Sequence, residues 1–433
     1  MKTPYSVDRI MQKLPLVKMK NLRRFFCFLL ILYLSSCAQE GSGRAVLWTD
    51  RPEFAFYAEF FNKSQDNYKV EVCYYASPAQ KLGEDGEYPD IVAASWLKNA
   101  SAKTLFRTLD GFFNSSGLSS SSFYPRLLSV GVIDNHQYLL PVSFNLPAIV
   151  FARGDFNQPP SNPFTIELEE IKKRGKEYNV ESNGVYTRMG FSPLSNDEFL
   201  FITAILLGVG FRESSPVAWD PLVMEQTISY LKNWITEANT SIQMEDDFIY
   251  KYLYDPPDRL VNSGRILYVY MDSSGFFILP EERRTNLDFR WLAAKEMIPL
   301  DEWSVYYGVL KKSKAGKAAE AFTYWFFNAE TQKQLLEAAK NNRMLETSFG
   351  ISGGFSAMKT VTEQIYPQFY PGLLGHMPPE SFLSPSNVLP RNWMIIKERI
   401  ILPYFRERIR NPNREDVRPL ERRMTDWYRL NRE

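Results

Sequence analysis

Residues 45–61 read AVLWTDRPEFAFYAEFF, and this stretch decides the fold class. The apolar run at 45–49 predicts a buried strand. Asp50, Pro52 and Glu53 are typical of a helix start, where a carboxylate caps the first turn, a proline stands early in it and an acidic residue follows three positions after the cap. The large apolar side chains beyond them recur at helical spacing. The stretch therefore predicts a strand that runs directly into a helix.

The same kind of unit recurs along the chain. Apolar or alternating runs predict strands over 70–74, 89–93 and 266–270, and capping signals predict helices that begin at Ser195–Glu198 and at Asp220-Pro221. Strands that alternate with helices favour a mostly parallel sheet covered by helices on both faces. Ligands bind such sheets at the carboxyl ends of the strands, so residues that directly follow a strand are the first candidates for a binding site.

Length and composition narrow the class of protein. A chain of 433 residues is long enough for two compact domains, each with its own core. The 51 basic and 50 acidic residues give a net charge of +1, which removes the general electrostatic argument for nucleic-acid binding. Two His and three scattered Cys exclude a zinc ribbon and a disulfide framework.

The N-terminal region is typical of an export signal. Four basic residues between positions 18 and 24 precede the apolar run 25–34, and small residues then lead to Cys37. The apolar run is too short to span a bilayer, which takes about 20 residues. The segment Leu34–Cys37 resembles the bacterial lipobox, whose cysteine is diacylated and becomes the first mature residue. We therefore expect a lipoprotein signal peptide over 1–36, with Met19 as an alternative start, and an exported protein anchored to a membrane by lipid on its cysteine.

Cleavage before Cys37 changes the composition. Residues 1–36 hold seven Lys and Arg and one Asp, so the mature chain has 44 basic and 49 acidic residues, a net charge of −5. Cys27 leaves with the signal and Cys37 carries the lipid, which leaves Cys73 as the single thiol and excludes an intrachain disulfide. Residues 37–44 form a short polar tether of the flexible type.

An ordered set of short segments resembles one known family. The segments are the strand with Trp48, Tyr88–Val92, Leu109-Asp110, His136–Ser143, Ala148–Ala152, Pro163–Thr165 with Glu169-Glu170, Phe248–Arg265, Gly308–Ser313 with Ala318, Ala319, Phe322 and Gln332, and Pro390 with Trp393. In this order they resemble the extracellular solute-binding proteins of ABC importers, the family of maltose-binding protein and related sugar-binding lipoproteins. The resemblance extends from residue 45 to about 408. Two segments depart from it: Ala76–Tyr88 is shorter than the family's helix there, and the charged tail 411–433 extends past the family's usual end as a solvated or frayed helix.

The resemblance implies a two-lobed α/β fold of the periplasmic-binding-protein type. Each lobe would be a mostly parallel sheet flanked by helices, and the lobes would close on a ligand about a hinge. The expected division assigns 45–146 and 300–345 to lobe one and 147–299 and 346–410 to lobe two.

A sugar site needs aromatic platforms for the apolar ring faces and carboxylates, amides or guanidinium groups for the hydroxyls. The resemblance and the positions after strands give eight candidate ligand-binding residues: Trp48, Asp50, Trp96, Asn145, Tyr270, Asp272, Trp303 and Trp393. Structural alternatives are a core position for Trp48, a helix cap for Asp50 and turn chemistry for Asp272. Trp234 and Trp325 lie in helical periodic stretches and are expected in the core, and Trp219 is expected beside the cap at Asp220.

The sequence therefore predicts the lipid-anchored substrate-binding component of an ABC transporter, which captures a sugar or oligosaccharide by hinge closure. Its expected partners are the ligand, the permease subunits and the membrane that holds the anchor, and the protein is expected to be a monomer. We predict no catalytic residue, no cofactor and no metal site, because no metal-binding, nucleophile or phosphate-binding motif occurs. The alternatives are a surface lipoprotein of the same fold used in adhesion or sensing, a receptor for a polyamine, peptide or anion, and a secreted hydrolase.

Overall fold

The computed structural model describes residues 43–84, 86–113, 117–154, 160, 162–411 and 417–431. The predicted signal peptide, the lipidation site Cys37 and most of the tether lie outside these residues. Among the residues that are described, none of the helices has the length and apolar character needed to cross a bilayer.

The larger sheet has six strands in the order β15-β6-β14-β3-β1-β2. Its strands are β1 (Arg44–Thr49), β2 (Lys69–Tyr74), β3 (Ile91–Ala94), β6 (Leu140–Phe144), β14 (Val305–Val309) and β15 (Phe355–Ser356). β1 pairs in parallel with β2 and β3, whereas β14 pairs antiparallel with β3 and β6, as β15 does with β6. The helices α2 (Glu53–Ser64) and α14 (Gly316–Phe326) pack on it through aromatic side chains, among them Phe61 and Phe322.

The smaller sheet has four strands in the order β11-β7-β12-β8. Its strands are β7 (Pro147–Ala152), β8 (Thr165–Glu167), β11 (Val269–Asp272) and β12 (Leu287–Ala293). One face of β7, with residues 149 and 151, packs in an apolar cluster with three helices: α7 (Leu168–Tyr178), α8 (Asp197–Leu207) and α9 (Pro221–Ala238). Its other face, with residues 148 and 150, belongs to a second apolar cluster that includes α12 (Ser273–Phe277). Alternate residues of one strand point to opposite faces, so the sheet is covered on both faces.

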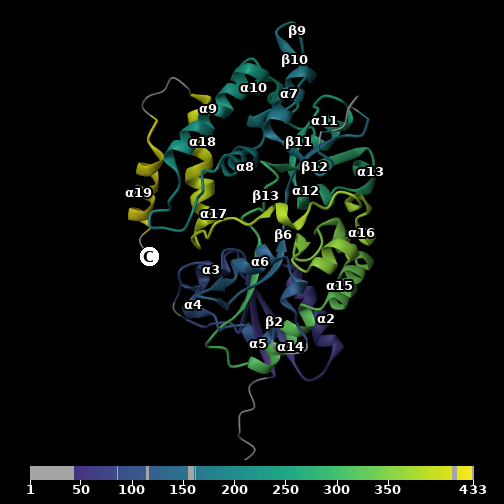
Figure 1. Ribbon diagram of the computed structural model, residues 1–433, viewed down its shortest axis with the longest axis vertical. Coiled ribbons are helices and arrows are strands. Elements are labelled where there is room, and N and C mark those ends of the chain that lie inside the picture. The colour runs from purple at the N-terminus through teal and green to yellow at the C-terminus, as the bar shows by residue number, and fades with distance from the viewer. Residues whose placement is uncertain are drawn as a thin grey trace, which may run out of the picture.

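The two sheets lie in two lobes stacked along the long axis, the larger sheet in the lower half of Figure 1 and the smaller one in the upper half. The chain crosses between them at residues 145–146, between β6 and β7, and again near residues 300–304, between β13 (Ile298–Pro299) and β14. Both sheets contain more antiparallel pairs than the mostly parallel sheets that we expected. In the larger sheet β14, which follows a crossing, runs antiparallel to β6, and in the smaller sheet β11 and β12 run antiparallel to β7.

The expected division of the chain needs one change. Residues 346–410 were assigned to lobe two, but β15 pairs with β6 in the larger sheet. The chain therefore stays with lobe one beyond residue 356 and returns to lobe two before β16 (Leu383–Ser384), which pairs with β13. A two-residue strand carries no periodic signal, which is why the sequence pattern did not reveal it.

The C-terminal segment forms α17 (Trp393–Ile396), a π-helical turn at Lys397–Ile401, α18 (Leu402–Arg410) and α19 (Leu420–Leu430). The tail was expected to be solvated or frayed, but Leu420 and Met424 of α19 are buried against this helical segment. The remaining elements are α3 (Pro78–Lys81), α4 (Ala102–Leu105), α5 (Asp110–Phe113), α6 (Pro125–Val130), β4 (Val132–Ile133), β5 (His136–Gln137), β9 (Val180–Ser182), β10 (Val185–Arg188), α10 (Ile242–Lys251), α11 (Pro257–Asn262), α13 (Glu281–Arg284), α15 (Ala329–Asn341) and α16 (Tyr366–Phe369).

Candidate functional site

A cavity of about 470 Å³ lies where the crossing at 301–303 meets the second lobe. Its volume falls within the ~300–1,000 Å³ that small-molecule sites occupy. Three elements form most of its wall: the first turns of α8, the end of β11 with the start of α12, and the crossing segment. The lining residues are Pro147, Asn196, Glu198, Phe201, Ile202, Pro257, Tyr270, Met271, Asp272, Gly275, Asp301, Glu302 and Trp303.

The cavity wall is acidic and partly aromatic. Four of its thirteen residues are carboxylic acids, and none is basic. Phe201, Tyr270 and Trp303 contribute aromatic surface. Burial, followed by the nearby carboxylates of Asp272 and Glu198, raises the pKa of Tyr270 well above its ordinary value, so its hydroxyl stays protonated.

Lys397, from the π-helical turn, lies behind this wall and holds two of its acids. Its Nζ donates to Glu198 Oε2 at 2.6 Å and also to Glu302 Oε1, and it lies 4.1 Å from the centre of the Phe201 ring. Burial lowers the pKa of Lys397, but Glu302 and Glu198 outweigh that effect and the net shift is upward. The ammonium therefore stays charged and fixes both carboxylates.

Asp301 has the most perturbed carboxyl group of the site. Burial, then Glu302 and Asp272, raise its pKa to about 8, although Arg51 and Lys397 act in the opposite direction. Its Oδ1 is buried without a hydrogen-bond partner in the described part of the chain. At neutral pH this carboxyl is mostly protonated, so it can donate a hydrogen bond to a ligand.

Asp272 is both a helix cap and a wall residue. Its Oδ1 accepts from Gly275 N at 2.5 Å and so caps α12. Burial raises its pKa. The turn chemistry considered as an alternative for this residue is therefore present, and the same carboxyl lines the cavity.

The structure brings together three of the eight predicted ligand residues, Tyr270, Asp272 and Trp303. Trp96 packs against Trp303, with ring centres 4.5 Å apart, and lines a small adjoining cavity of about 40 Å³. Whether these residues contact a ligand stays a prediction.

Trp393 and Trp48 lie in the apolar core instead. Trp393 is 0% exposed and packs against Phe201 and Phe211, with ring centres 6.0 and 5.3 Å away. Trp48 is 5% exposed and packs against Tyr75 at 4.7 Å. Neither lines the 470 Å³ cavity, although Trp393 lines a neighbouring cavity of about 170 Å³ that shares Phe201 and Glu302 with it.

Asp50 does not cap the helix that follows it. Pro52 occupies the cap position of α2 without a side-chain cap, whereas Asp50 Oδ2 accepts from Ser95 N at 3.2 Å. The neighbouring Arg51 donates to Ser95 Oγ at 3.1 Å and to Trp303 O at 2.8 Å. Asp50 and Arg51 thus tie the loops after β1 and β3 to the crossing segment.

Asn145 lies in the crossing rather than in the cavity wall. Its Nδ2 donates to Gly353 O at 2.9 Å, its Oδ1 accepts from Ser273 Oγ at 2.6 Å, and its carbonyl accepts from Asp301 N at 3.2 Å. It therefore joins both crossings to the start of α12, which is the place where a hinge would turn.

Five charged or aromatic residues in or against the cavity wall were not predicted from the sequence: Glu198, Phe201, Asp301, Glu302 and Lys397. Glu198 was treated as part of a capping box, and the signal for the acidic pair 301–302 was its position beside Trp303. Nothing in the sequence pattern pointed to Lys397. Among the described residues, no group of three or more His, Cys, Asp and Glu side chains is placed to hold a metal ion.

Residues 48–333 match the family model of bacterial extracellular solute-binding proteins. None of the curated proteins matches the sequence. The solved structure of a cyclo/maltodextrin-binding protein complexed with maltotetraose is 15% identical, with a TM-score of 0.60 over 92% of this chain and 100% of that one. An ABC substrate-binding protein from Listeria monocytogenes in complex with cycloalternan is 15% identical, with a TM-score of 0.59 over 89% and 98% of the two chains. The sugar-binding protein MalE from Xanthomonas citri is 10% identical, with a TM-score of 0.59 over 90% and 100%. At these identities the likeness shows the fold, and it confirms the predicted two-lobed architecture.

Proposed function

Because the chain belongs to the bacterial extracellular solute-binding proteins, as its sequence predicted, we propose that it captures a sugar or oligosaccharide in the 470 Å³ cavity where the crossing segment meets the second lobe. The observation that carries this proposal is the cavity wall itself, in which Tyr270 and Trp303 stand among four carboxylic acids. The similar solved structures that hold maltotetraose and cycloalternan support the same class of ligand.

The chemistry of the wall suits a carbohydrate. The aromatic rings offer apolar surface for the ring faces of a sugar. Ionised carboxylates accept charge-assisted hydrogen bonds from hydroxyls, and the protonated carboxyl of Asp301 can donate one. An anion would meet a wall without a basic side chain, so an anionic solute is disfavoured.

Capture would proceed by hinge closure. The cavity draws residues from the crossing segment and from the second lobe, and Asn145 joins the two crossings. A ligand that contacts both the crossing and the lobe stabilises the closed arrangement by its differential affinity for that state.

Delivery would involve a membrane anchor and a transporter. We expect lipid on Cys37 to hold the protein on the outer side of a membrane and the permease subunits of an ABC transporter to accept the ligand. Replacing Cys37 by Ala should release the protein from membranes or leave the signal uncut. Unchanged membrane association of that variant would contradict the anchor.

A thermal-shift screen against a sugar panel tests the binding proposal. At a ligand concentration of about 100 Kd the free energy of unfolding rises by about 2.7 kcal/mol, which moves the midpoint by about 3 °C in a chain of this size. Trp303→Ala should abolish the shift and Trp325→Ala, a change remote from the cavity, should keep it. A shift with a peptide or polyamine, and with none of the carbohydrates, would contradict the proposal.

A further inference from the structure

We propose that the ligand of the 470 Å³ cavity is an amino sugar, or an oligosaccharide that carries a free protonated amine. This inference rests on the proposed function for the sugar and on the charge of the cavity wall for the amine. In the proposed complex, one ammonium group of the ligand binds among the carboxyl groups of Asp272, Asp301, Glu198 and Glu302.

The cavity wall contains four carboxylic acids and no basic side chain that could balance their charge. Glu198, Asp272, Asp301 and Glu302 all line the cavity, and no Lys, Arg or His does. These groups are close enough to affect one another: burial raises the pKa of Asp301 and of Glu198, and in both cases Glu302 and Asp272 raise it further while Lys397 lowers it. A neutral sugar bound in the cavity would not reduce the repulsion among these carboxyl groups.

The basic side chains near the cavity either bind other groups or lie outside its lining. Lys397 Nζ is shared between Glu198 and Glu302. Arg51 bonds to Ser95 and to the carbonyl of Trp303 and lies beside Asp50, 3.4 Å from its Oδ1. Lys98 lines the adjoining 40 Å³ cavity with Glu302 rather than the main one.

Two carboxyl groups of the wall therefore remain without a cation of their own in the described structure. Asp272 accepts one backbone hydrogen bond, from Gly275. Asp301 has a buried Oδ1 with no partner. A buried acceptor without a donor is unfavourable, and an ammonium brings three donors together with the missing positive charge.

Binding of the amine should also move a proton. Asp301, with a pKa of about 8 in the empty cavity, is mostly protonated at neutral pH. An ammonium beside it favours the ionised carboxylate, so the carboxyl proton passes to solvent as the ion pair forms. The heat of binding should then depend on the ionisation enthalpy of the buffer for an amino sugar and not for a neutral one.

The decisive measurement compares matched ligands by calorimetry at pH 6.5, where hexosamines are largely protonated. Glucose, galactose and mannose, and their disaccharides, are each tested in three forms: 2-hydroxyl, 2-acetamido and 2-amino. In whichever ring series binds, we expect the 2-amino form to bind at least tenfold more tightly than the 2-acetamido form. The preference should weaken with added salt less steeply than for a surface site, because the groups are buried.

Two variants and a control test the assignment to this wall. Asp301→Asn and Asp272→Asn should each reduce the preference for the amine, measured as the ratio of the 2-amino to the 2-acetamido affinity, at least tenfold. Asp247→Asn removes an exposed carboxylate of the same lobe, on α10, and should leave the preference unchanged.

The possible results separate this inference from the proposed function. Equal or tighter binding of the neutral forms would overturn the inference and leave the sugar receptor standing. An amine preference that survives both Asp variants would overturn the assignment to these carboxyl groups. Binding of spermidine with none of the sugars in any form would overturn the inference together with the proposed function.

Discussion

At the scale of single residues, Lys397 is a buried charge held between two acidic side chains. Its side chain is nearly inaccessible, and it pairs with Glu302, which is 8% exposed, and with the half-exposed Glu198. A buried ion pair adds little stability by itself, because its charges lose their hydration. Removing one partner is different, since it leaves a buried charge uncompensated.

Replacing Lys397 by Met should lower the free energy of unfolding by about 3–5 kcal/mol at pH 7. The loss should be smaller at pH 5, because burial raises the pKa of Glu198 and its protonation removes one of the carboxylate charges that Lys397 balances. Urea unfolding followed by circular dichroism at both pH values measures the difference. Lys63→Met, which breaks an exposed pair with Glu59 on α2, serves as the control and should cost less than about 0.5 kcal/mol. A loss as small as that of the control would contradict the assigned role.

Glu245 makes stability depend on pH at a place remote from the cavity. It is 0% exposed and accepts from Asn239 Nδ2 at 2.7 Å and from Ser192 Oγ. Burial raises its pKa from 4.5 to about 7, although the hydrogen bonds from Asn239 and Ser192 act in the opposite direction. Between pH 4.5 and 7 the folded protein therefore binds this proton more tightly than the unfolded chain, and stability falls as the pH rises.

Glu245→Gln should remove that dependence and keep both side-chain hydrogen bonds, because an amide can accept from Asn239 and donate to Ser192. Each pH unit within the window is worth about 1.4 kcal/mol, so the stability of the wild type relative to the variant should fall by about 3 kcal/mol between pH 4.5 and 7.5. Denaturant unfolding across this range measures it. Glu337→Gln, an exposed change on α15, should show no such trend, and parallel curves for wild type and Glu245→Gln would show that the carboxyl does not titrate in this window.

At the scale of elements, α8 shows how a local signal builds part of the site. Asn196 caps this helix, and its Oδ1 accepts from Glu198 N at 2.8 Å and from Phe199 N at 3.3 Å. The cap fixes the first turn, from which Asn196, Glu198 and Phe201 reach the cavity. The position of three wall residues thus depends on one capping side chain.

Asn196→Ala should lower the free energy of unfolding by about 1 kcal/mol and weaken ligand binding as well. Asn328→Ala is the matched control, since Asn328 caps α15 in the other lobe with the same geometry, accepting from Glu330 N at 2.9 Å and Thr331 N at 3.1 Å. We expect equal stability losses and a loss of affinity for Asn196→Ala alone. Chemical denaturation and calorimetric titration of both variants measure the two effects, and equal affinities would show that the cap does not position the wall.

The elements of the structure also show which parts of the fold could be predicted from the sequence. The strand at 44–49 and the helices that begin near Asn196 and Asp220 follow from local patterns, because propensity and capping are decided by neighbours in the chain. The strand expected at 266–270 forms only over 269–272, since pairing with β7 sets its bounds. The direction of a side chain at a helix start depends on tertiary packing, which is why the sequence could not show that Trp393, the first residue of α17, is buried and does not line the 470 Å³ cavity.

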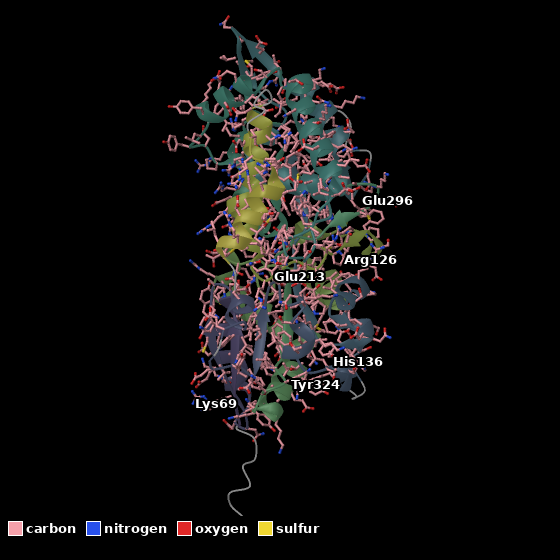
Figure 2. The ribbon with its side chains drawn as sticks, turned by 90° about the vertical axis from the view of Figure 1, so that its left-hand side faces the viewer. Lys69, Arg126, His136, Glu213, Glu296 and Tyr324 are labelled. Atoms are coloured by element: carbon pink, nitrogen blue, oxygen red, sulfur yellow. The ribbon has the colours of Figure 1, made fainter. Side chains whose placement is uncertain are left out.

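At the scale of the whole molecule, the two lobes are joined on both sides of the cavity. On one side Phe277 of α12 stacks on Phe349, with ring centres 4.9 Å apart, within an apolar cluster that includes residues of both sheets. On the other side a second apolar cluster also includes residues of both lobes, and polar contacts add to it: Arg126 Nη1 donates to Leu383 O at 3.0 Å, and Arg391 Nη2 donates to Ser101 Oγ at 3.2 Å. Figure 2 shows Arg126 at mid-height, where the lobes meet. A stacked aromatic core opens less readily than single hydrogen bonds, so closure should make and break the polar side.

Arg391→Ala should therefore weaken ligand binding by about two- to tenfold, the equivalent of one hydrogen bond worth ~0.5–1.5 kcal/mol, with little change in the unfolding midpoint. The reason is that the contact with Ser101 favours the closed arrangement that binds the ligand. Calorimetry gives the affinity, and thermal unfolding gives the stability. Arg399→Ala removes an exposed charge from the same helical segment and should change neither.

Gly83 makes this prediction sharper, because a Cβ at that position would lie 1.9 Å from Arg391 Nη1. Gly83→Ala should therefore displace the guanidinium group and weaken binding to the same degree as Arg391→Ala. If both changes act through the one contact with Ser101, the double variant should be no weaker than either single variant. Additive losses would mean that the two positions act independently, and that this contact does not couple the lobes. Equal and non-additive losses would identify the polar side of the molecule as the part that opens when ligand leaves.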